Sequence, residues 1–479
     1  MEPGVWNRRL SEDVFAAQRT EVLAQWPTGA SIDLDEAVDR HHAMPPSKNV
    51  SRAVASALGE GRTLIQPRGG VATVDGQIEL LRGLQEAGAD LLPTTLDSYT
   101  RNCRFTEAQE GLRASLEQGR SLLNGFPVVN HGVDGCRRVV DSVELPLVGR
   151  PGAPDARLAA EVALAAGYSD FEGGPLDYFF AYTKDTRPEH VIAWWQYIYR
   201  LAGYYESCGV PIHQEQYGSI TGTLVPPSLA LAVVTVEAIM AAEQGVRHVG
   251  LGYGQEGCLV QDVAALRVYP QVARRYLDRL GYAHVRLGTV MNQWMGAFPS
   301  DEAAAMGVIG WGAVTAAFGH ATEVITKSPH EAEGIPTIKA NAEGIRCTRQ
   351  LLNMLRHQAF PDSELLAQEM EIIDREASAV LDRILDFGDG DVAAGVVRAI
   401  DAGVLEIPFS PSKHNRGRIL PARDAMGAVR LLDFGNLPFP DDVKEFHRSR
   451  ILCRGARDGK AADYHMVIED VYAISHGHL

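Results

Sequence analysis

The chain has 479 residues and a formal net charge of −16, and hydrophobic residues make up 46% of it. That length fits one (β/α)8 barrel with extensions, or two to three domains. The acidic balance disfavours a nucleic-acid groove, which needs clustered Lys and Arg, and adsorption to an anionic membrane. We therefore expect neither nucleic acid nor a membrane among its partners.

The N-terminal residues MEPGVWNRRLSEDVF contain no apolar segment of the kind that a secretory signal needs. The six cysteines are widely spaced and form no CxxC pair, so they predict neither a zinc site nor a disulfide framework. A reducing cytoplasm is the simplest location for such a chain. The most apolar stretch, residues 229–242, is too short to span a bilayer and carries Glu237, which predicts a buried helix.

In chain order, residues 1–60 form a polar N-terminal lead-in. A join then recurs in which a helical pattern ends at a glycine and an apolar strand follows directly, at Gly88, Gly209, Gly245 and Gly281. Glycine suits the left-handed position just past a helix end. Strands separated by helices predict βαβ units and a parallel sheet.

Eight or nine candidate strands lie between residues 63 and 328, which suits an α/β fold of the (β/α)8 TIM-barrel class. They lie near 63–68, 90–95, 125–130, 143–149, 168–172, 210–216, 247–252, 284–291 and 322–327. Residues 361–404 read as helices, and residues 405–479 are rich in Pro, Gly and Arg. The sequence thus predicts a lead-in at 1–60, a barrel at 61–360 and an α/irregular extension at 361–479 packed on the barrel.

The carboxyl ends of barrel strands face the active site. At these ends the chain places Arg68, Arg101 and Arg150, followed by Glu172. Three converging guanidinium groups in an acidic protein indicate a small polyanion, most simply a dicarboxylate or a phosphate held bidentately. Glu172 is then a candidate for holding a substrate ammonium group or for acting as a base. The competing interpretation is ordinary ion pairing between arginines and acids of the rim.

Lys327 lies at a late strand end, where it is a candidate for a Schiff base or a cofactor contact, or else a surface lysine. Trp294, Met295 and Phe298 form an aromatic and apolar cluster, which is more often core than the floor of a cofactor site. The segment GYGQEG at 252–257 matches GxGxxG after a strand. A single match is weak evidence, so we assign its glycines to a βα turn.

Longer segments carry a family resemblance. Among them are RGGVATVDGQIELLRGLQEAGADLLPTTLDSYTRN, EGGPLDYFFAY, QWMGAFPSDE, PHEAEGIPT and IPFSPSKHNRG. From about residue 60 to the C-terminus, the chain resembles the large (epsilon) subunits of glutamate mutase, also called methylaspartate mutase. The resemblance implies a (β/α)8 barrel and an adenosylcobalamin-dependent isomerase that interconverts L-glutamate and 3-methylaspartate.

The resemblance also implies a partner. In this family two large subunits join two small subunits, and the small subunit carries the cobalamin-binding DxHxxG motif. The segment DRHHAM at 39–44 lacks the glycine of that motif, and nothing else in the chain comes close. We therefore expect a heterotetramer built on a homodimer of this chain, with adenosylcobalamin shared with a separate small subunit. No metal ligand is expected from this chain.

The resemblance implies roles for individual residues. Arg68, Arg101 and Arg150 would grip the two substrate carboxylates, Glu172 would meet the amino group, and Tyr178 and Tyr182 would contact the substrate. Contacts to the cofactor would come from Gly70, Asn124, Ala181, Phe298, Lys327, Glu331 and Ile335.

Three positions depart from the family pattern. Pro151 and Asn292 replace histidines near the pocket, and Ala181 replaces a proline. These departures leave open a paralogue that isomerises another acidic amino acid. Two further alternatives are a cobalamin-independent Schiff-base lyase that uses Lys327, and a non-catalytic relative retained for assembly. The intact arginines and Glu172 argue against the last of these.

Overall fold

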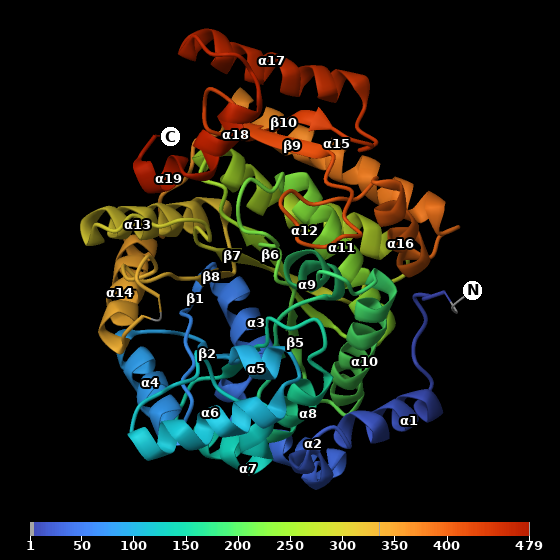
Figure 1. Ribbon diagram of the computed structural model, residues 1–479, viewed down its shortest axis with the longest axis vertical. Helices are drawn as coiled ribbons and strands as arrows, with labels where there is room; N and C mark the ends of the chain where they lie inside the picture. Colours follow the sequence, from blue (N-terminus) through green and yellow to red (C-terminus); the bar gives the residue numbers. More distant parts are fainter. Residues whose placement is uncertain (1–3, 335, 479) are drawn as a thin grey trace.

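The computed structural model describes residues 4–334 and 336–478, and its centre is a ring of parallel strands surrounded by helices (Figure 1). The strands pair in the order β1-β8-β7-β6-β5-β4-β3-β2. They are β1 (Leu64–Gln66), β2 (Leu92–Thr95), β3 (Leu147–Arg150), β4 (Asp170–Phe171), β5 (His213–Glu215), β6 (His248–Gly254), β7 (Arg286–Asn292) and β8 (Glu323–Ile325). This topology confirms the predicted barrel class.

The barrel closes between β1 and β2 through a few bonds and not through a regular ladder. The backbone N–H groups of Asp90 and Leu91 donate to the carbonyl of Ile65, at 2.9 and 3.2 Å. Further up, the N–H of Thr95 donates to the carbonyl of Gly69 at 2.9 Å. The Asp90 carboxylate also accepts the N–H of Ile65 at 2.8 Å. We refer to this contact between β1 and β2 as the seam.

Helices cover the outside of the barrel. They are α4 (Val74–Ala87), α6 (Phe105–Gln118), α7 (Val128–Asp141), α8 (Arg157–Ala166), α10 (Pro188–Ser207), α11 (Pro227–Glu243), α12 (Leu259–Arg279), α13 (Glu302–Gly319) and α14 (Ile338–Leu355). Two short helices, α5 (Ser98–Arg101) and α9 (Pro175–Tyr182), follow β2 and β4. The predicted joins are confirmed, because Gly88, Gly209, Gly245 and Gly281 all have positive φ.

The strand predicted at 125–130 is wrong. Phe126 forms only an isolated bridge with Leu96, and α7 begins at Val128. Pro127 has no N–H to give to a ladder, which explains why the pairing stops there. The apolar residues that suggested a strand are instead the buried start of a helix, an ambiguity that apolar runs of this length always carry.

Two apolar helices differ in burial. α11 contains the stretch 229–242, and every residue from 227 to 242 is buried, which confirms the predicted buried helix. Among the described residues, α13 alone is long and apolar enough to cross a bilayer, and 39% of its apolar window is buried. That buried face packs against α12 and α14, as the face of a core helix does.

The lead-in is largely helical, with α1 (Glu12–Leu23), α2 (Leu34–Ala43), α3 (Val50–Glu60) and two short 3-10 helices, η1 (Pro27–Ser31) and η2 (Pro46–Lys48). Val50, Val54 and Ala57 of α3 pack against residues at the amino ends of the first strands, namely Leu64, Leu91 and Val148. This helix therefore covers the amino end of the barrel and leaves the carboxyl end as the place for a site.

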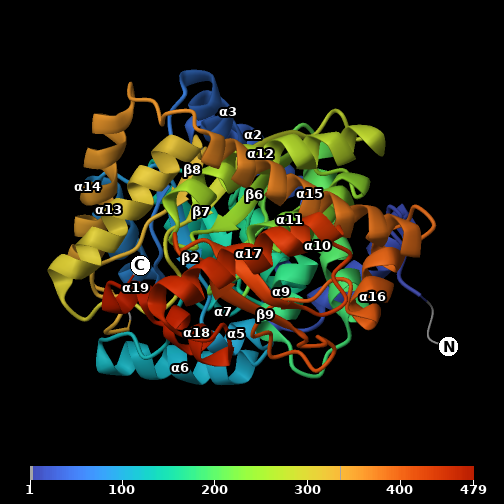
Figure 2. The ribbon, with the colours of Figure 1, turned by 90° about the horizontal axis from the view of Figure 1, so that it is seen from above.

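The C-terminal segment contains α15 (Glu364–Phe387), α16 (Val392–Ala402), β9 (Ile419–Arg423), β10 (Val429–Phe434), α17 (Asp441–Asp458), α18 (Tyr464–Val471) and α19 (Ala473–His476). Its strands form an antiparallel hairpin, which the expected α/irregular composition did not include. α15 packs along α11 and α12, and α19 lies beside α13 (Figures 1 and 2). The division into lead-in, barrel and extension at residues 60 and 360 stays a prediction.

Candidate functional site

Arg150 is the last residue of β3, and its side chain is 3% exposed. Its Nη1 atom donates to Gln66 Oε1 at 2.7 Å and to both oxygens of Glu215 at 3.1 Å. Its Nη2 atom donates to Glu172 Oε1 at 3.3 Å. Side chains from β1, β3 and β5 and from the residue after β4 thus meet at one point inside the barrel.

Charge balance explains why this cluster is stable. Burial alone would lower the pKa of Arg150, but the Glu172 and Glu215 carboxylates outweigh it and raise that pKa above its ordinary value. Burial raises the pKa of Glu215 to about 8, although Arg150 opposes the rise. Arg150 is therefore permanently charged and already ion-paired, which is the competing interpretation given above for a rim arginine. Its Nε atom has no hydrogen-bond partner among the described residues.

Glu172 connects Arg150 to α9. Its Oε2 atom accepts the hydroxyl of Tyr178 at 2.6 Å, and that hydroxyl in turn accepts the backbone N–H of Gly152 at 3.2 Å. Gly152, with φ of +55°, lies against the guanidinium of Arg101, since a Cβ on it would come within 3.0 Å of Arg101 Nη1. Arg101 itself donates through Nε to the carbonyl of Leu96 at 2.8 Å. The structure therefore brings Arg101, Arg150 and Glu172 together.

Arg68 completes the predicted trio. Its Nη1 atom lies 3.9 Å from the sulfur of Met295. Burial raises the pKa of Tyr217, and both Arg68 and Glu172 act electrostatically on that hydroxyl, so all three share one end of the barrel. Neither Arg68 nor Arg101 has a carboxylate partner within the described part of the chain. Among the described residues named at this site, these two arginines are the cations without an ion pair.

Lys327 follows β8 and is 4% exposed. Its amine donates to Glu331 Oε2 at 3.2 Å, while the other oxygen of Glu331 accepts the N–H of Ser328 at 3.2 Å. Burial lowers the pKa of Lys327 to about 8; Glu331 opposes this shift, and Arg68 and Arg150 add to it. The predicted alternative of a surface lysine is wrong, because this amine is buried within the electrostatic reach of the arginines.

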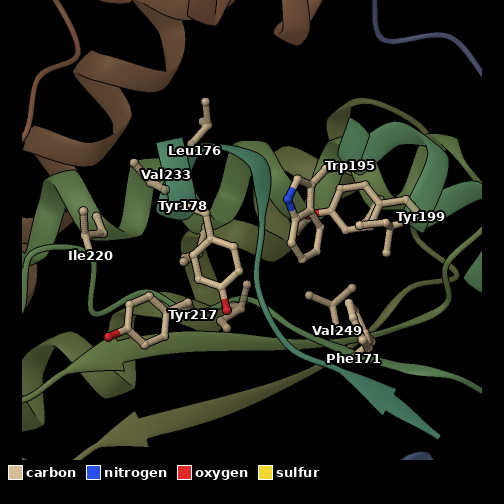
Figure 3. Packing of buried hydrophobic residues seen from close by; sticks show 14 of the residues in the cluster. Phe171, Leu176, Tyr178, Trp195, Tyr199, Tyr217, Ile220, Val233 and Val249 are labelled. Atoms are coloured by element: carbon tan, nitrogen blue, oxygen red, sulfur yellow. The ribbon is translucent and has the colours of Figure 1, made fainter. Parts of the chain in front are cut away.

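Aromatic side chains pack beside this polar cluster, and Figure 3 shows Tyr178 and Tyr217 among them. The rings of Tyr178 and Tyr182 lie 5.3 Å apart between centroids, and those of Tyr178 and Tyr217 lie 5.9 Å apart. Tyr178 is fully buried, whereas Tyr182, at the end of α9, is 45% exposed. Of the two predicted tyrosines, one belongs to the buried polar cluster and the other reaches the surface.

The predicted cofactor residues occupy rim loops. A Cβ on Gly70 would lie 2.2 Å from the carbonyl oxygen of Thr95, so close backbone packing explains this glycine without any ligand. Asn124 is exposed, and its Oδ1 atom accepts the N–H of Ser98 at 2.9 Å. Ala181 is half-buried on α9.

Phe298 is 9% exposed and packs with Trp294, which supports the core interpretation of that cluster. Ile335 lies outside the described residues. In the GxGxxG segment, a Cβ on Gly252 would lie 2.1 Å from the carbonyl of Gln216, so this glycine serves close strand packing.

The departures from the family pattern are also near the site. Pro151 is buried directly after Arg150. Asn292, at the end of β7, is 1% exposed and donates to the carbonyl of Tyr217 at 3.3 Å. Its Oδ1 atom is buried without a partner among the described residues, so this amide retains an acceptor at the site.

Sequence reasoning missed Gln66 and Glu215, which hold Arg150 from below. Both are 0% exposed within strands. A carboxyl group in the interior of a strand is costly unless it is paired, and that cost was the available signal.

Comparison with known proteins settles the family. The model of the methylaspartate mutase E chain family matches residues 44–479. The chain belongs to this family. The glutamate mutase epsilon subunit of Desulfitobacterium hafniense is 55% identical over 474 residues, which are 99% of this chain and 98% of that protein. The epsilon subunits of Treponema denticola and Halobacterium salinarum are 47% and 48% identical over 98% and 99% of this chain, and over 97% and 98% of their own lengths.

Among solved structures, the tryptophan synthase alpha subunit of Legionella pneumophila aligns with 63% of this chain and 97% of its own chain, with 14% identity and a TM-score of 0.33. That likeness is too weak to add to the family assignment. The eight-stranded barrel of this family member follows from its own strand order.

Proposed function

We propose that this chain is the substrate-binding subunit of an adenosylcobalamin-dependent mutase that interconverts L-glutamate and 3-methylaspartate. The observation that carries the proposal is the convergence of Arg68, Arg101 and Arg150 with Glu172 at the carboxyl end of the barrel, in a full-length member of the methylaspartate mutase E chain family.

The proposed substrate is an acidic amino acid, because the charges of the rim match its three ionic groups. Arg68 and Arg101 have no carboxylate partner among the described residues, and each offers a planar fork that fits a carboxylate. Arg150 keeps its Nε donor for the same purpose. Glu172, fixed by Arg150 and Tyr178, is placed to accept a hydrogen bond from the substrate ammonium group. Held at both ends, a short molecule stays oriented while its carbon skeleton rearranges.

The rim residues fit the chemistry of the proposed cofactor. Lys327 and Glu331 supply a donor and an acceptor side by side, which suits the hydroxyl groups of a nucleoside. The exposed Asn124 and Gly70, with its backbone close to β2, are the chain's proposed contacts to the corrinoid. When bound, adenosylcobalamin supplies the organic radical that abstracts hydrogen from the substrate. The chain's own task is to bind, orient and shield the substrate from water.

The proposed partner is a small subunit that carries the DxHxxG motif. The relatives are named epsilon subunits, which implies at least one other subunit, and this chain has no such motif of its own. We propose the heterotetramer with two copies of each chain, located in the cytoplasm. Family membership removes the Schiff-base lyase as the main activity, and the buried Lys327 is assigned to the adenosyl group instead.

The test is reconstitution. The purified chain is mixed with the cobalamin-binding small subunit from the same genome and adenosylcobalamin, and each acidic amino acid is followed by proton NMR. We expect isomerisation of glutamate to 3-methylaspartate only when both subunits are present, and no corrinoid retained by this chain alone after desalting. Turnover of a different acidic amino acid would assign the Pro151 and Asn292 departures to specificity. Absence of any turnover, or tight corrinoid binding without the small subunit, would contradict the proposal.

A further inference from the structure

Glu237 is the one acidic residue within the apolar stretch of α11, and it is 0% exposed. An unpaired carboxyl group at such a position costs several kcal/mol, on the order of what removes a small domain's stability. Its hydrogen-bond partners therefore indicate its role, and none of the proposed substrate or cofactor contacts involves Glu237.

Two backbone partners of Glu237 lie at the start of α9. Its Oε1 atom accepts the backbone N–H of Leu176 at 2.7 Å and that of Asp177 at 2.9 Å. These amides belong to the first turn of α9, which has no capping side chain of its own at Gly174. A Cβ on Gly174 would lie 2.2 Å from the Glu237 carboxyl carbon. The glycine thus makes room for a cap that comes from another helix.

Asp177 extends the same contact to the loop after β5. Its Oδ2 atom accepts the N–H of Gly218 at 2.9 Å, next to Tyr217. Its Oδ1 atom is buried and has no N–H or hydroxyl partner among the described residues. A protonated Glu237 supplies the missing donor, because a neutral carboxyl group carries one O–H.

The protonation states agree with this arrangement. Burial raises the pKa of Glu237 well above its ordinary value, and the nearby Asp177 raises it further. Burial raises the pKa of Asp177 to about 6, while its hydrogen bond with Glu237 lowers it. These directions favour a protonated Glu237 beside a charged Asp177, which is the arrangement that gives the partnerless Oδ1 atom of Asp177 a donor.

We infer that Glu237 and Asp177 are positioning residues for the substrate site: they fix α9 and the Tyr217 loop to each other, so that Tyr178 stays bonded to Glu172. Figure 3 shows Tyr178 on α9 beside Tyr217 of that loop, with Val233 and Leu176 above Tyr178 in the view. Through Tyr178, the pair holds the Glu172 carboxylate and the Gly152 backbone beside Arg101. The inference rests on the proposed function, because its consequence is read in substrate binding.

The test compares three variants of Glu237 in the complex with the small subunit. Glu237→Gln keeps an acceptor for the two amides and an N–H donor for Asp177, as the neutral acid does. Glu237→Met removes both at similar volume, and Glu237→Asp keeps the acid but shortens its reach. Thr235→Val is the matched control, since Thr235 is 0% exposed on the same helix and its hydroxyl has no partner among the described residues.

We expect the KM for glutamate to rise about tenfold in Glu237→Met and about three- to tenfold in Glu237→Asp, because a lost helix cap and a displaced tyrosine are together worth roughly one decade in binding. The kcat should fall less than KM rises. Glu237→Gln should stay within about threefold of the parent, and Thr235→Val should be unchanged.

An unchanged KM in a folded Glu237→Met variant would overturn the inference; if that variant does not fold, an unchanged KM in Glu237→Asp does so. Equal impairment of folded Gln and Met variants would overturn the assigned proton on Glu237. If the parent complex does not turn over glutamate, the proposed function fails instead, so the two failures are distinguishable.

Discussion

Two buried arginines of this protein, Arg150 at the site and Arg430 in the C-terminal segment, show how similar surroundings serve different ends. Arg430 is 2% exposed, and its Nη atoms form a fork on Glu369 while Nε donates to Asp424 at 2.9 Å. Its guanidinium also lies 4.8 Å from the ring centre of Phe446. Its nitrogens are thus all engaged, and its contacts join α15 to the β9–β10 hairpin.

Arg150 is equally buried but differently matched. It leaves Nε without a partner among the described residues, while Glu172 keeps a second role through Tyr178. The burial of an arginine therefore does not separate a structural from a functional residue. The difference lies in which hydrogen-bond donors and charges have no protein partner and therefore remain for a ligand.

Substitution of each buried arginine should give the largest difference between the two regions. We expect Arg150→Met and Arg430→Met each to lower the free energy of unfolding by about 3–5 kcal/mol, because each strands buried carboxylates. Only Arg150→Met should also reduce kcat/KM, by at least about 100-fold, since it alone removes a proposed substrate contact. Urea denaturation and steady-state kinetics below the unfolding temperature measure the two effects. A comparable loss of kcat/KM in a folded Arg430→Met variant would break the distinction.

Arg101 tests the rim without the buried ion pairs. The single described hydrogen bond of its side chain goes to the carbonyl of Leu96, so Arg101→Lys should change stability by less than about 1 kcal/mol. The KM for glutamate should rise about 10- to 100-fold, because one ammonium group does not reproduce a planar fork. Isothermal titration of the complex with glutamate provides an independent check. An unaltered affinity would remove Arg101 from the substrate site.

Glu172 tests the proposed ammonium contact. In Glu172→Gln the amide still accepts from Tyr178, but it loses the charge that would face the substrate amino group. Since charge-assisted hydrogen bonds are about twice as strong as neutral ones, we expect kcat/KM to fall roughly tenfold. Association with the small subunit, followed by size-exclusion chromatography, should be unaffected. Full activity of the variant would assign Glu172 to structure alone, like Glu369.

The effect expected at Lys327 is on the pH dependence of stability and not on the kinetics of the site. The pKa of Lys327 is lowered to about 8, so between pH 8 and the unfolded value of 10.5 the unfolded chain binds one more proton than the folded chain. The stability of the parent should therefore rise with pH across this interval, relative to that of Lys327→Met. Thermal unfolding at pH 7.5, 9 and 10.5 follows the difference between the two proteins. A difference that is constant over this range would show that the amine titrates normally.

Much of this architecture can be predicted from the sequence, and the wrong predictions have physical causes. The helix–glycine–strand joins follow from local rules, as the positive φ of Gly88 illustrates, and of the three arginines expected at strand ends Arg150 ends β3, Arg68 follows β1 by two residues and Arg101 ends the short helix α5 after β2. The strand predicted at 125–130 was wrong because the short apolar run at 126–129 fits a buried strand and the start of a buried helix equally well. Site-residue roles taken from the family resemblance remain predictions.

Hydrogen-bond partners that lie on different strands of the barrel could not be predicted from sequence patterns. Glu215 and Gln66 meet Arg150 only because β1, β3 and β5 converge, a contact between residues 65 or more positions apart. Glu237 was recognisable as an anomaly within an apolar helix, but its partner amides on α9 are 60 residues away. Such long-range pairs depend on closure of the barrel, which local periodicity does not encode.

The seam gives this closure a consequence for ligand binding. Arg68 follows β1 and Arg101 follows β2, so these two arginines, which have no carboxylate partner among the described residues, lie on opposite sides of the seam, where the described strands form no regular ladder. An anion bound by both arginines would connect the two sides of the seam. Because coupling between binding and conformation is reciprocal, any change that stabilises the seam also raises the affinity for the anion. Loss of the anion, in turn, destabilises the seam.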